Sequence, residues 1–250
     1  MTLEVLFAPV EFAALAQRDL TQTACVVFDV LRATSTIVAA LANGARAIIP
    51  VAEIPDALAV HKQCPDVLLA GERNGLRIRA SMANGTVFHL GNSPREFAAA
   101  RIHNKTIVLS TTNGSRALRA CAGAKTVLIG SFLNLQATAN YLERHPAPHL
   151  LLVCSGTADQ AAYEDILGAG ALADLVWARF AGGEVADSAH TARQIYLQNS
   201  RDLMAAMEFS RNGRRLLSIP DLRGDVSWCL QRDVYPLVAK LDGDAITKVA

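Results

Sequence analysis

Short apolar runs alternate with longer Ala- and Leu-rich stretches over most of the chain, and this alternation limits the folds that the sequence can adopt. Six runs have the length and β-branched content of strands, and each leads into a polar or glycine-containing turn. They comprise residues 24–30, 45–51, 66–72, 105–112, 125–131 and 149–156. Apolar residues make up 51% of the chain and aromatic residues only 6%, which suits buried parallel strands between Ala-rich helices. The sequence therefore predicts an α/β fold with a largely parallel sheet.

The remaining segments extend this prediction over the whole chain. Residues 1–12 are typical of a first strand, and residues 71–94 of a long loop or small hairpin near the active face. The last forty residues predict a helix, a loop around 220–224 and a closing helix from Asp225. No linker interrupts the chain, so we expect residues 1–250 to form a single domain.

Two segments of the chain are similar to each other. Residues 33–49 and 112–128 share four features in the same order: a hydroxyl-rich helix entry, an Ala/Leu helix, a Gly-Ala pair that ends the helix, and a basic residue before the next strand. Internal duplication explains this similarity. Convergent turn chemistry explains it equally well, because Ser or Thr before a helix and Gly after one are common signals.

The charge and cysteine content exclude several classes of partner. The chain has 24 basic and 23 acidic residues in mixed order, so it offers no basic stripe for nucleic acid. No apolar run approaches the roughly 18 residues of a membrane span, and the start lacks the basic region of a signal peptide. Five widely spaced cysteines without a CxxC motif are typical of buried thiols in a reducing compartment. We therefore expect a cytoplasmic protein that binds neither nucleic acid nor membranes.

A first polar cluster follows the strand at residues 24–30. Asp29 stands at the strand end, and Arg32, Ser35 and Thr36 follow at a helix entry. A carboxylate there can bind a hard cation or attack phosphorus, while the arginine and the helix N-terminus can hold anionic oxygens. In the alternative interpretation, the polar residues only cap the helix.

A second cluster follows the strand at residues 105–112. Its turn comprises Ser110, Thr111, Thr112, Asn113, Gly114 and Ser115, and such a turn can form a cradle of N–H and hydroxyl groups for phosphate or carboxylate oxygens. Asn-Gly is also an ordinary turn signal. The presence of the first cluster favours the anion-binding interpretation.

Two further clusters carry acidic residues. Glu72 and Arg73 follow the apolar run at residues 66–71, and Asn92 and Ser93 come from the same long loop. Glu72 is a candidate metal ligand and Arg73 a candidate anion clamp, with the other two as donors. A pair of solvated loop residues is the alternative.

Glu164 and Asp165 stand in the first turn of a predicted helix. The helix macrodipole favours acids there without any function, by about 0.3–1 kcal/mol each. Adjacent carboxylates nevertheless suit Mg²⁺, which takes one or two protein oxygens and completes its shell with water and substrate phosphate. The six histidines show no HxH or HExxH spacing, so zinc is not expected.

In this order, the clusters resemble the 2-phosphosulfolactate phosphatase family, a group of Mg²⁺-dependent phosphatases named for a step of coenzyme M synthesis. The matching blocks are FDVLRATST, the GER turn, FHLGNSP, LSTTNGSRAL and YEDILGAGAL, with a weaker match at SRNGRRLL followed by Asp225. The resemblance spans roughly residues 5 to 235. Three departures are a longer stretch between Gly75 and Phe88, Ser115 in place of a typical Thr, and Asn212 in place of His.

The resemblance implies a three-layer α/β/α fold with a mixed sheet, Mg²⁺ as cofactor and phosphate-ester hydrolysis where these turns meet. The acidic candidates for the metal are Asp29, Glu72, Glu164 and Asp165. The anion-binding candidates are Arg32, Ser35, Thr36, Asn92, Ser93, Thr112, Asn113 and Gly114. Within these sets we assign catalysis to Asp29, Arg32 and Glu164.

The expected substrate is a small anionic phosphate ester, with (R)-2-phospho-3-sulfolactate as the first choice and another phosphorylated 2-hydroxy acid as the alternative. Its second anionic end would meet Arg73 or the turn at 91–94. Either a water activated by a carboxylate or Asp29 itself could attack phosphorus. The rival class is a non-catalytic protein that binds an anionic metabolite. The apolar helices leave room for a homodimer.

Overall fold

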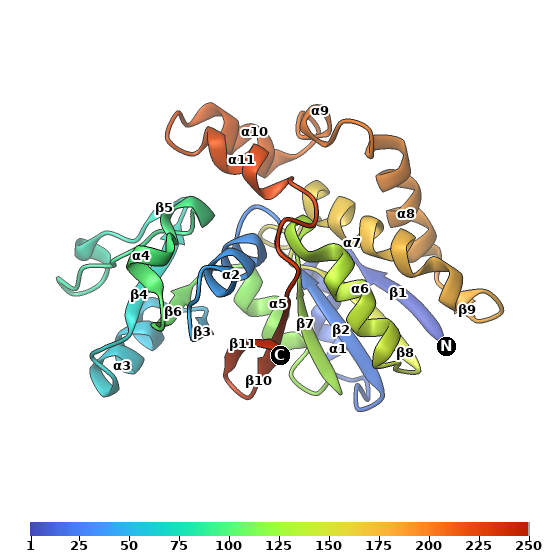
Figure 1. Ribbon diagram of the computed structural model, residues 1–250, viewed down its shortest axis with the longest axis horizontal. Coiled ribbons are helices and arrows are strands. Elements are labelled where there is room, and N and C mark those ends of the chain that lie inside the picture. The colour runs from blue at the N-terminus through green and yellow to red at the C-terminus, as the bar shows by residue number, and fades with distance from the viewer. Residues whose placement is uncertain (250) are drawn as a thin grey trace.

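The computed structural model describes residues 1–249, and it confirms the α/β prediction. Within these residues one sheet has the strand order β5-β4-β6-β3-β11-β10-β7-β2-β8-β1-β9 (Figure 1). The strands are β1 (Thr2–Leu6), β2 (Thr23–Phe28), β3 (Ala47–Val51), β4 (Leu68–Arg73), β5 (Leu76–Arg77), β6 (Thr106–Ser110), β7 (Thr126–Gly130), β8 (His149–Cys154), β9 (Glu184–Val185), β10 (Val238–Asp242) and β11 (Ala245–Val249). All six runs that the sequence marked as strands form strands, and the first strand lies at the start of the chain as predicted.

Helices follow or connect the strands. They are α1 (Phe12–Leu15), α2 (Ala33–Ala42), α3 (Ile54–Gln63), α4 (Ala99–Ile102), α5 (Gly114–Ala120), α6 (Leu135–Arg144), α7 (Tyr163–Val176), α8 (Asp187–Asn199), α9 (Leu203–Ala206), α10 (Arg211–Ser218) and α11 (Arg223–Cys229). None of the helices formed by residues 1–249 is both long and apolar enough to span a membrane.

Strand β2 shows why the sheet is covered on both faces. Its side chains alternate between faces, as in any strand. Val26 and Phe28 pack with buried residues of α6, α7 and α8, whereas Cys25 and Val27 pack with buried residues of α1, α2 and α5. Both faces of β2 are apolar because both are covered. The chain therefore has the three-layer α/β/α arrangement that the family resemblance implied.

The sheet is mixed because a C-terminal hairpin joins two parallel halves. Strand β2 runs parallel to β7 and β8, and β6 runs parallel to β3 and β4. Strands β10 and β11 pair with each other, with β7 and with β3, in every case antiparallel. The pairing between β11 and β3 is limited to Ile246 opposite Ile48.

This hairpin corrects one prediction. The sequence predicted a closing helix from Asp225, but that helix, α11, begins at Arg223 and ends at Cys229, and strands complete the chain. The segment Val238–Asp242 contains two charged residues, which made its alternating strand pattern difficult to recognise in the sequence. The two-residue loop between β10 and β11 is Gly243 and Asp244, with Gly243 at a φ of 57°, and Gly-Asp between two strands is a hairpin signal.

The two similar segments occupy equivalent places in the sheet. One forms α2 and leads from β2 to β3, and the other forms α5 and leads from β6 to β7. Each unit thus links the two halves of the sheet, because β2 pairs with β7 and β3 pairs with β6. The shared strand, turn, helix and strand order is confirmed, and its origin by duplication stays a prediction.

The segment 71–94 contains a small hairpin, as one of the two sequence alternatives proposed. Strands β4 and β5 pair antiparallel around a turn at Asn74 and Gly75. Both turn residues have a positive φ, 57° and 77°, which Asn and Gly adopt more readily than other residues. The hairpin brings the end of β4 and the turn beside the start of α2, where Arg32 bonds to the turn.

Candidate active site

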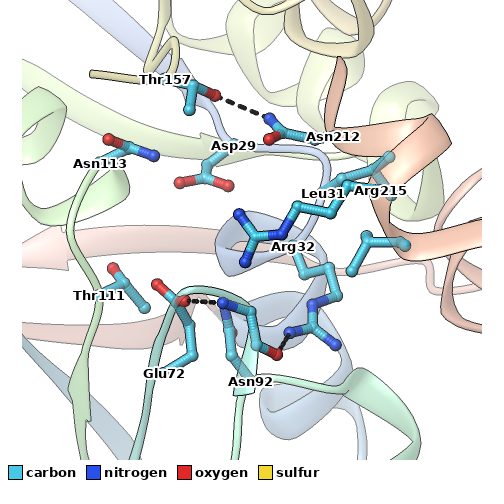
Figure 2. A pocket seen from close by; sticks show the side chains of 12 residues that line it. Asp29, Leu31, Arg32, Glu72, Asn92, Thr111, Asn113, Thr157, Asn212 and Arg215 are labelled. Atoms are coloured by element: carbon cyan, nitrogen blue, oxygen red, sulfur yellow. Dashed lines mark hydrogen bonds between the residues drawn. The ribbon is translucent and has the colours of Figure 1, made fainter. Parts of the chain in front are cut away.

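A cavity of about 70 Å³ lies where the carboxyl ends of β2, β4 and β6 meet helix α10 (Figure 2). Its lining residues are Asp29, Leu31, Arg32, Glu72, Gly75, Asn92, Thr111, Asn113, Thr157, Asn212, Arg215 and Leu216. Ligands in α/β proteins collect at the carboxyl ends of strands. The cavity therefore stands where the sequence predicted the site.

Asp29 follows directly after β2 and is held by the first turn of α2. Its backbone N–H donates to Thr34 Oγ1 at 3.1 Å, and its backbone oxygen accepts from the Thr34 N–H at 2.9 Å. Asp29 Oδ1 accepts from the Ala33 N–H at 3.1 Å. The carboxylate thus caps α2, as the alternative interpretation held, and it also lines the cavity; its role in metal binding or catalysis stays a prediction.

Burial makes Asp29 an unusual acid. It is 8% exposed, and loss of solvent raises the pKa of its carboxyl to about 7, with the nearby carboxylates of Glu72 and Glu164 adding to the rise. The N–H groups of Ala33 and Gly114 oppose the rise because they donate to the carboxylate. Negative charge gathered in a cavity of this kind favours a proton or a cation.

Arg32 lines the cavity and is held in a buried network of charges. Its Nη1 donates to Asp225 Oδ2 at 2.5 Å and its Nη2 to the Gly75 backbone oxygen at 2.6 Å. The other carboxylate oxygen of Asp225, on α11, accepts from Ser93 Oγ and from Arg95 Nε, both at 2.7 Å. Asp225 therefore joins the C-terminal helices to the first polar cluster and fixes the side chain of Arg32.

Glu72 reaches the cavity from the end of β4. Its Oε2 accepts from the Gly75 N–H at 2.7 Å, a bond drawn in Figure 2. Among residues 1–249 no group donates to its Oε1. Asn92, next to it in the lining, has a buried Oδ1 without a hydrogen-bond partner in the same residues. The cavity therefore presents oxygen atoms with unused lone pairs.

Glu164 and Asp165 begin α7 as predicted, and each supports the cavity from behind. Glu164 accepts from Ser210 Oγ at 2.5 Å and from Asn212 Nδ2 at 2.6 Å. Asp165 Oδ1 accepts from the Val30 N–H at 2.8 Å and Oδ2 from the Gly156 N–H at 3.1 Å. Burial raises the pKa of the Asp165 carboxyl well above its usual value, and the charges of Glu164 and Asp29 raise it further.

The structure brings only part of the predicted residues to the cavity. Asp29, Arg32, Glu72, Asn92 and Asn113 line it. Gly114 lies behind Asp29, so that a Cβ atom at this position would stand 3.1 Å from Asp29 Oδ2. The predicted residues that do not line it are Ser35, Thr36, Arg73, Ser93, Thr112, Glu164 and Asp165.

Most of those residues have other partners. Ser35 Oγ donates to the Val30 backbone oxygen at 2.8 Å, and Thr36 Oγ1 donates to that of Asn92 at 2.9 Å. Arg73 donates to the backbone oxygens of Glu72 and Ala52 and to Ser110 Oγ. Thr112 is exposed. Arg73 therefore does not line this cavity, and its expected role as a clamp for the second end of the substrate stays a prediction.

Thr111, a member of the predicted hydroxyl turn, lines the cavity. Sequence reasoning assigned no role to four other polar residues that line or support it, namely Thr157, Asn212, Arg215 and Asp225. The last three belong to the SRNGRRLL block and the segment after it, which the resemblance included without assigning a role. The block was therefore the available signal.

The fold and the cavity define an α/β protein with a polar site, lined by carboxylates and arginines, at its strand ends. The family model described as 2-phosphosulpholactate phosphatase matches residues 12–244. A protein of Thermotoga maritima is 38% identical over 218 residues, covering 86% of this chain and 88% of that protein. One of Pseudothermotoga lettingae is 35% identical over 229 residues, covering 92% and 94%. Both are named "Probable 2-phosphosulfolactate phosphatase".

The chain belongs to the 2-phosphosulpholactate phosphatase family, and with it to the phosphoric monoester hydrolases. The family resemblance that the five sequence blocks indicated is therefore confirmed. Another relative, from Caldicellulosiruptor saccharolyticus, carries the same name and is 34% identical over 228 residues, or 90% of this chain and 91% of that protein.

Proposed function

We propose that this chain is a Mg²⁺-dependent phosphatase that hydrolyses (R)-2-phospho-3-sulfolactate to 3-sulfolactate and phosphate. The relatives carry the name of this activity. The observation that carries the assignment to this cavity is the meeting of two carboxylates, Asp29 and Glu72, with two arginines, Arg32 and Arg215, around one small cavity. A phosphate ester and a cation together complement such a mixed lining.

The residues of the cavity fit a magnesium ion. Among residues 1–249 no group of three or more His, Cys, Asp or Glu side chains is placed to hold a metal. Mg²⁺ does not require such a group, since it is usually held by one or two carboxylates, water and substrate phosphate. Glu72 Oε1, Asn92 Oδ1 and the carboxylate of Asp29 are hard oxygen donors that line the cavity. Asp29 and Glu72 would hold the ion.

The ion would supply positive charge beside the phosphoryl oxygens. The chain's own residues bind and orient the ester. Thr111 Oγ1 and the side-chain amide of Asn113 line the wall next to Asp29 and supply donors for phosphoryl oxygens. Arg32 adds a fixed positive charge behind them, since Asp225 and Gly75 leave its guanidinium no freedom to move. Asp165 and Glu164 hold the loops around the wall in place.

Two routes of attack on phosphorus suit this arrangement. A water molecule can attack as it loses its proton to a carboxylate of the cavity, or Asp29 can attack directly and form an aspartyl phosphate that water then hydrolyses. In both routes the P–O bond to the substrate alcohol breaks, and the alcohol oxygen leaves with a proton that water supplies. Quenching the reaction in acid and treating the protein with hydroxylamine distinguishes the routes. Only the direct route leaves a phosphate bound to the protein.

The test of the proposed function is phosphate release from purified protein. The panel contains 2-phosphosulfolactate, 2-phospholactate and ethyl phosphate, each with Mg²⁺ and with EDTA. We expect the fastest release from 2-phosphosulfolactate with Mg²⁺ and loss of release in EDTA that added Mg²⁺ restores. Equal rates in EDTA would contradict the metal requirement, and no release from any ester with any divalent ion would contradict the function.

A further inference from the structure

Arg215 differs from the other arginines around the site because its charge has no partner. Its guanidinium makes no hydrogen bond or ion pair with residues 1–249, although it lines the cavity. By contrast, Arg32 bonds to Asp225, and Arg95 bonds to Asp225 and to the Asp221 backbone oxygen. The cation of Arg215 is thus available to a ligand.

The side chain points into the cavity from α10. Figure 2 shows it extending from the helix toward the middle of the lining residues. A Cβ atom at Gly75 would stand 2.8 Å from Arg215 Nη2, so the guanidinium lies against the turn of the β4 and β5 hairpin. Glycine at position 75, which also has a φ of 77°, leaves the space that the guanidinium occupies.

Arg215 enters the cavity from a different wall than the groups assigned to the phosphoryl end. Asp29 and Thr111 lie at strand ends and are buried, at 8% and 4% exposure. Arg215 is exposed and comes from the other wall, formed by α10. A substrate that places its phosphoryl group at the strand ends therefore directs its other end toward α10.

We propose that Arg215 binds the second anionic group of the substrate, a carboxylate or sulfonate, and thereby selects phosphate esters of acids over esters of neutral alcohols. This inference rests on the proposed function, because it takes the phosphoryl end to lie beside Asp29. A guanidinium matches both oxyanions, since its N–H groups form parallel hydrogen bonds to two oxygens of one group. Arg215 is a specificity-determining residue that takes the place expected for Arg73.

The test compares ligands that differ only in the second anion. Phosphoglycolate carries a carboxylate where ethyl phosphate carries a methyl group, and both are assayed for phosphate release. The phosphonates 3-phosphonopropionate and propylphosphonate differ in the same way, and 2-phosphonoethanesulfonate carries a sulfonate. Their binding is measured by calorimetry with Mg²⁺ and does not depend on turnover, so the inference is tested even when no ester is hydrolysed.

The variants are Arg215→Gln, Arg215→Lys and, as a matched control, Arg214→Gln. Arg214 is an exposed neighbour on the same helix that bonds to the Glu208 backbone oxygen and does not line the cavity. We expect Arg215→Gln to weaken binding of 3-phosphonopropionate and 2-phosphonoethanesulfonate by about 10- to 100-fold, as for a lost charge-assisted pair. Binding of propylphosphonate should stay within about twofold.

With phosphoglycolate the loss should appear mainly in KM, with partial recovery in Arg215→Lys and no change in Arg214→Gln. Equal weakening of ligands with and without the second anion would place Arg215 at the phosphoryl group and overturn the inference. Unchanged binding of every phosphonate would overturn it as well. Failure of the proposed function has a different signature, since the wild-type protein would then bind the phosphonates and release no phosphate.

Discussion

Asp225 offers the sharpest test of how the site is held together. Its carboxylate is fully buried and bonds to two arginines of very different exposure: the Arg32 side chain is 3% exposed and that of Arg95 is 44% exposed. Replacing Asp225 with Asn keeps the size of the side chain and removes its charge. The buried guanidinium of Arg32 then keeps the Gly75 oxygen as an acceptor but loses its counter-ion.

The exposures decide the expected magnitudes. Removing one partner of a buried ion pair costs about 3–5 kcal/mol, because the remaining charge stays buried without compensation. Removing a largely exposed partner costs about 0–1 kcal/mol, because water solvates both the arginine and its replacement. We therefore expect Asp225→Asn to lower the free energy of unfolding by about 3–5 kcal/mol, and Arg95→Gln by less than about 1 kcal/mol.

Urea unfolding followed by circular dichroism measures both values. Asp221→Asn is the matched control, since Asp221 is an exposed acid four residues before Asp225 and its side chain makes no hydrogen bond within residues 1–249. Its midpoint should stay at the wild-type value. A change for Asp225→Asn no larger than that of Asp221→Asn, at an unchanged m-value, would refute the reasoning, because the buried pair would then contribute nothing net.

Three other changes probe the acids and the glycine. In EDTA, Asp29→Asn should gain stability over wild type by on the order of 3 kcal/mol as the pH rises from 4 to 8. The pKa of the buried carboxyl is raised to about 7, so wild type loses stability as that carboxyl ionises. Urea unfolding of both proteins at pH 4 and 8 measures this, and a difference in unfolding free energy that does not change with pH would contradict it. Gly114→Ala should lower kcat at least about tenfold, since the new methyl group stands 3.1 Å from Asp29 Oδ2 and displaces that carboxylate. The far-ultraviolet circular dichroism spectrum should stay unchanged. A wild-type kcat would show that Asp29 tolerates the displacement. Asp165→Ala should cost about 2–4 kcal/mol in thermal or urea unfolding, because the N–H groups of Val30 and Gly156 lose their acceptor. A cost no larger than that of Asp66→Ala, a control at an exposed acid, would contradict it.

The sequence predicted the strand-end part of the site because the pattern there is local. Asp29 follows five apolar residues and precedes a helix entry, and the strand that they form delivers it to the cavity. The position of Glu72 was predicted in the same way, as the polar residue that follows an apolar run. The polar residue after a buried strand was thus a reliable guide in both places.

The geometry of strands and turns explains why two of the predicted residues, Arg73 and Thr112, do not line the cavity. Side chains of successive strand residues point to opposite faces, so a strand end that directs Glu72 to the cavity directs Arg73 away from it. The turn after β6 separates its neighbouring threonines in a similar way, since Thr111 lines the cavity and Thr112 is exposed. Treating adjacent polar residues as one cluster ignored this geometry.

The wall formed by α10 was not predictable from local patterns. Asn212 and Arg215 lie on a short polar helix whose own sequence does not say which element it packs against. Their position is fixed over long range by bonds from Asn212 to Glu164 and from Arg32 to Asp225. The first bond joins two residues that are 48 positions apart in the sequence, and the second joins two that are 193 positions apart. Only the folded chain shows such contacts.

The most direct test of the central claim is the initial rate of phosphate release from 2-phosphosulfolactate by wild type and by Asp29→Asn in the same Mg²⁺ buffer. If the cavity around Asp29 is the active site, the variant should lose at least about 10³-fold in rate and keep the wild-type circular dichroism spectrum. A folded Asp29→Asn protein that releases phosphate at near the wild-type rate would contradict the account and place the chemistry elsewhere.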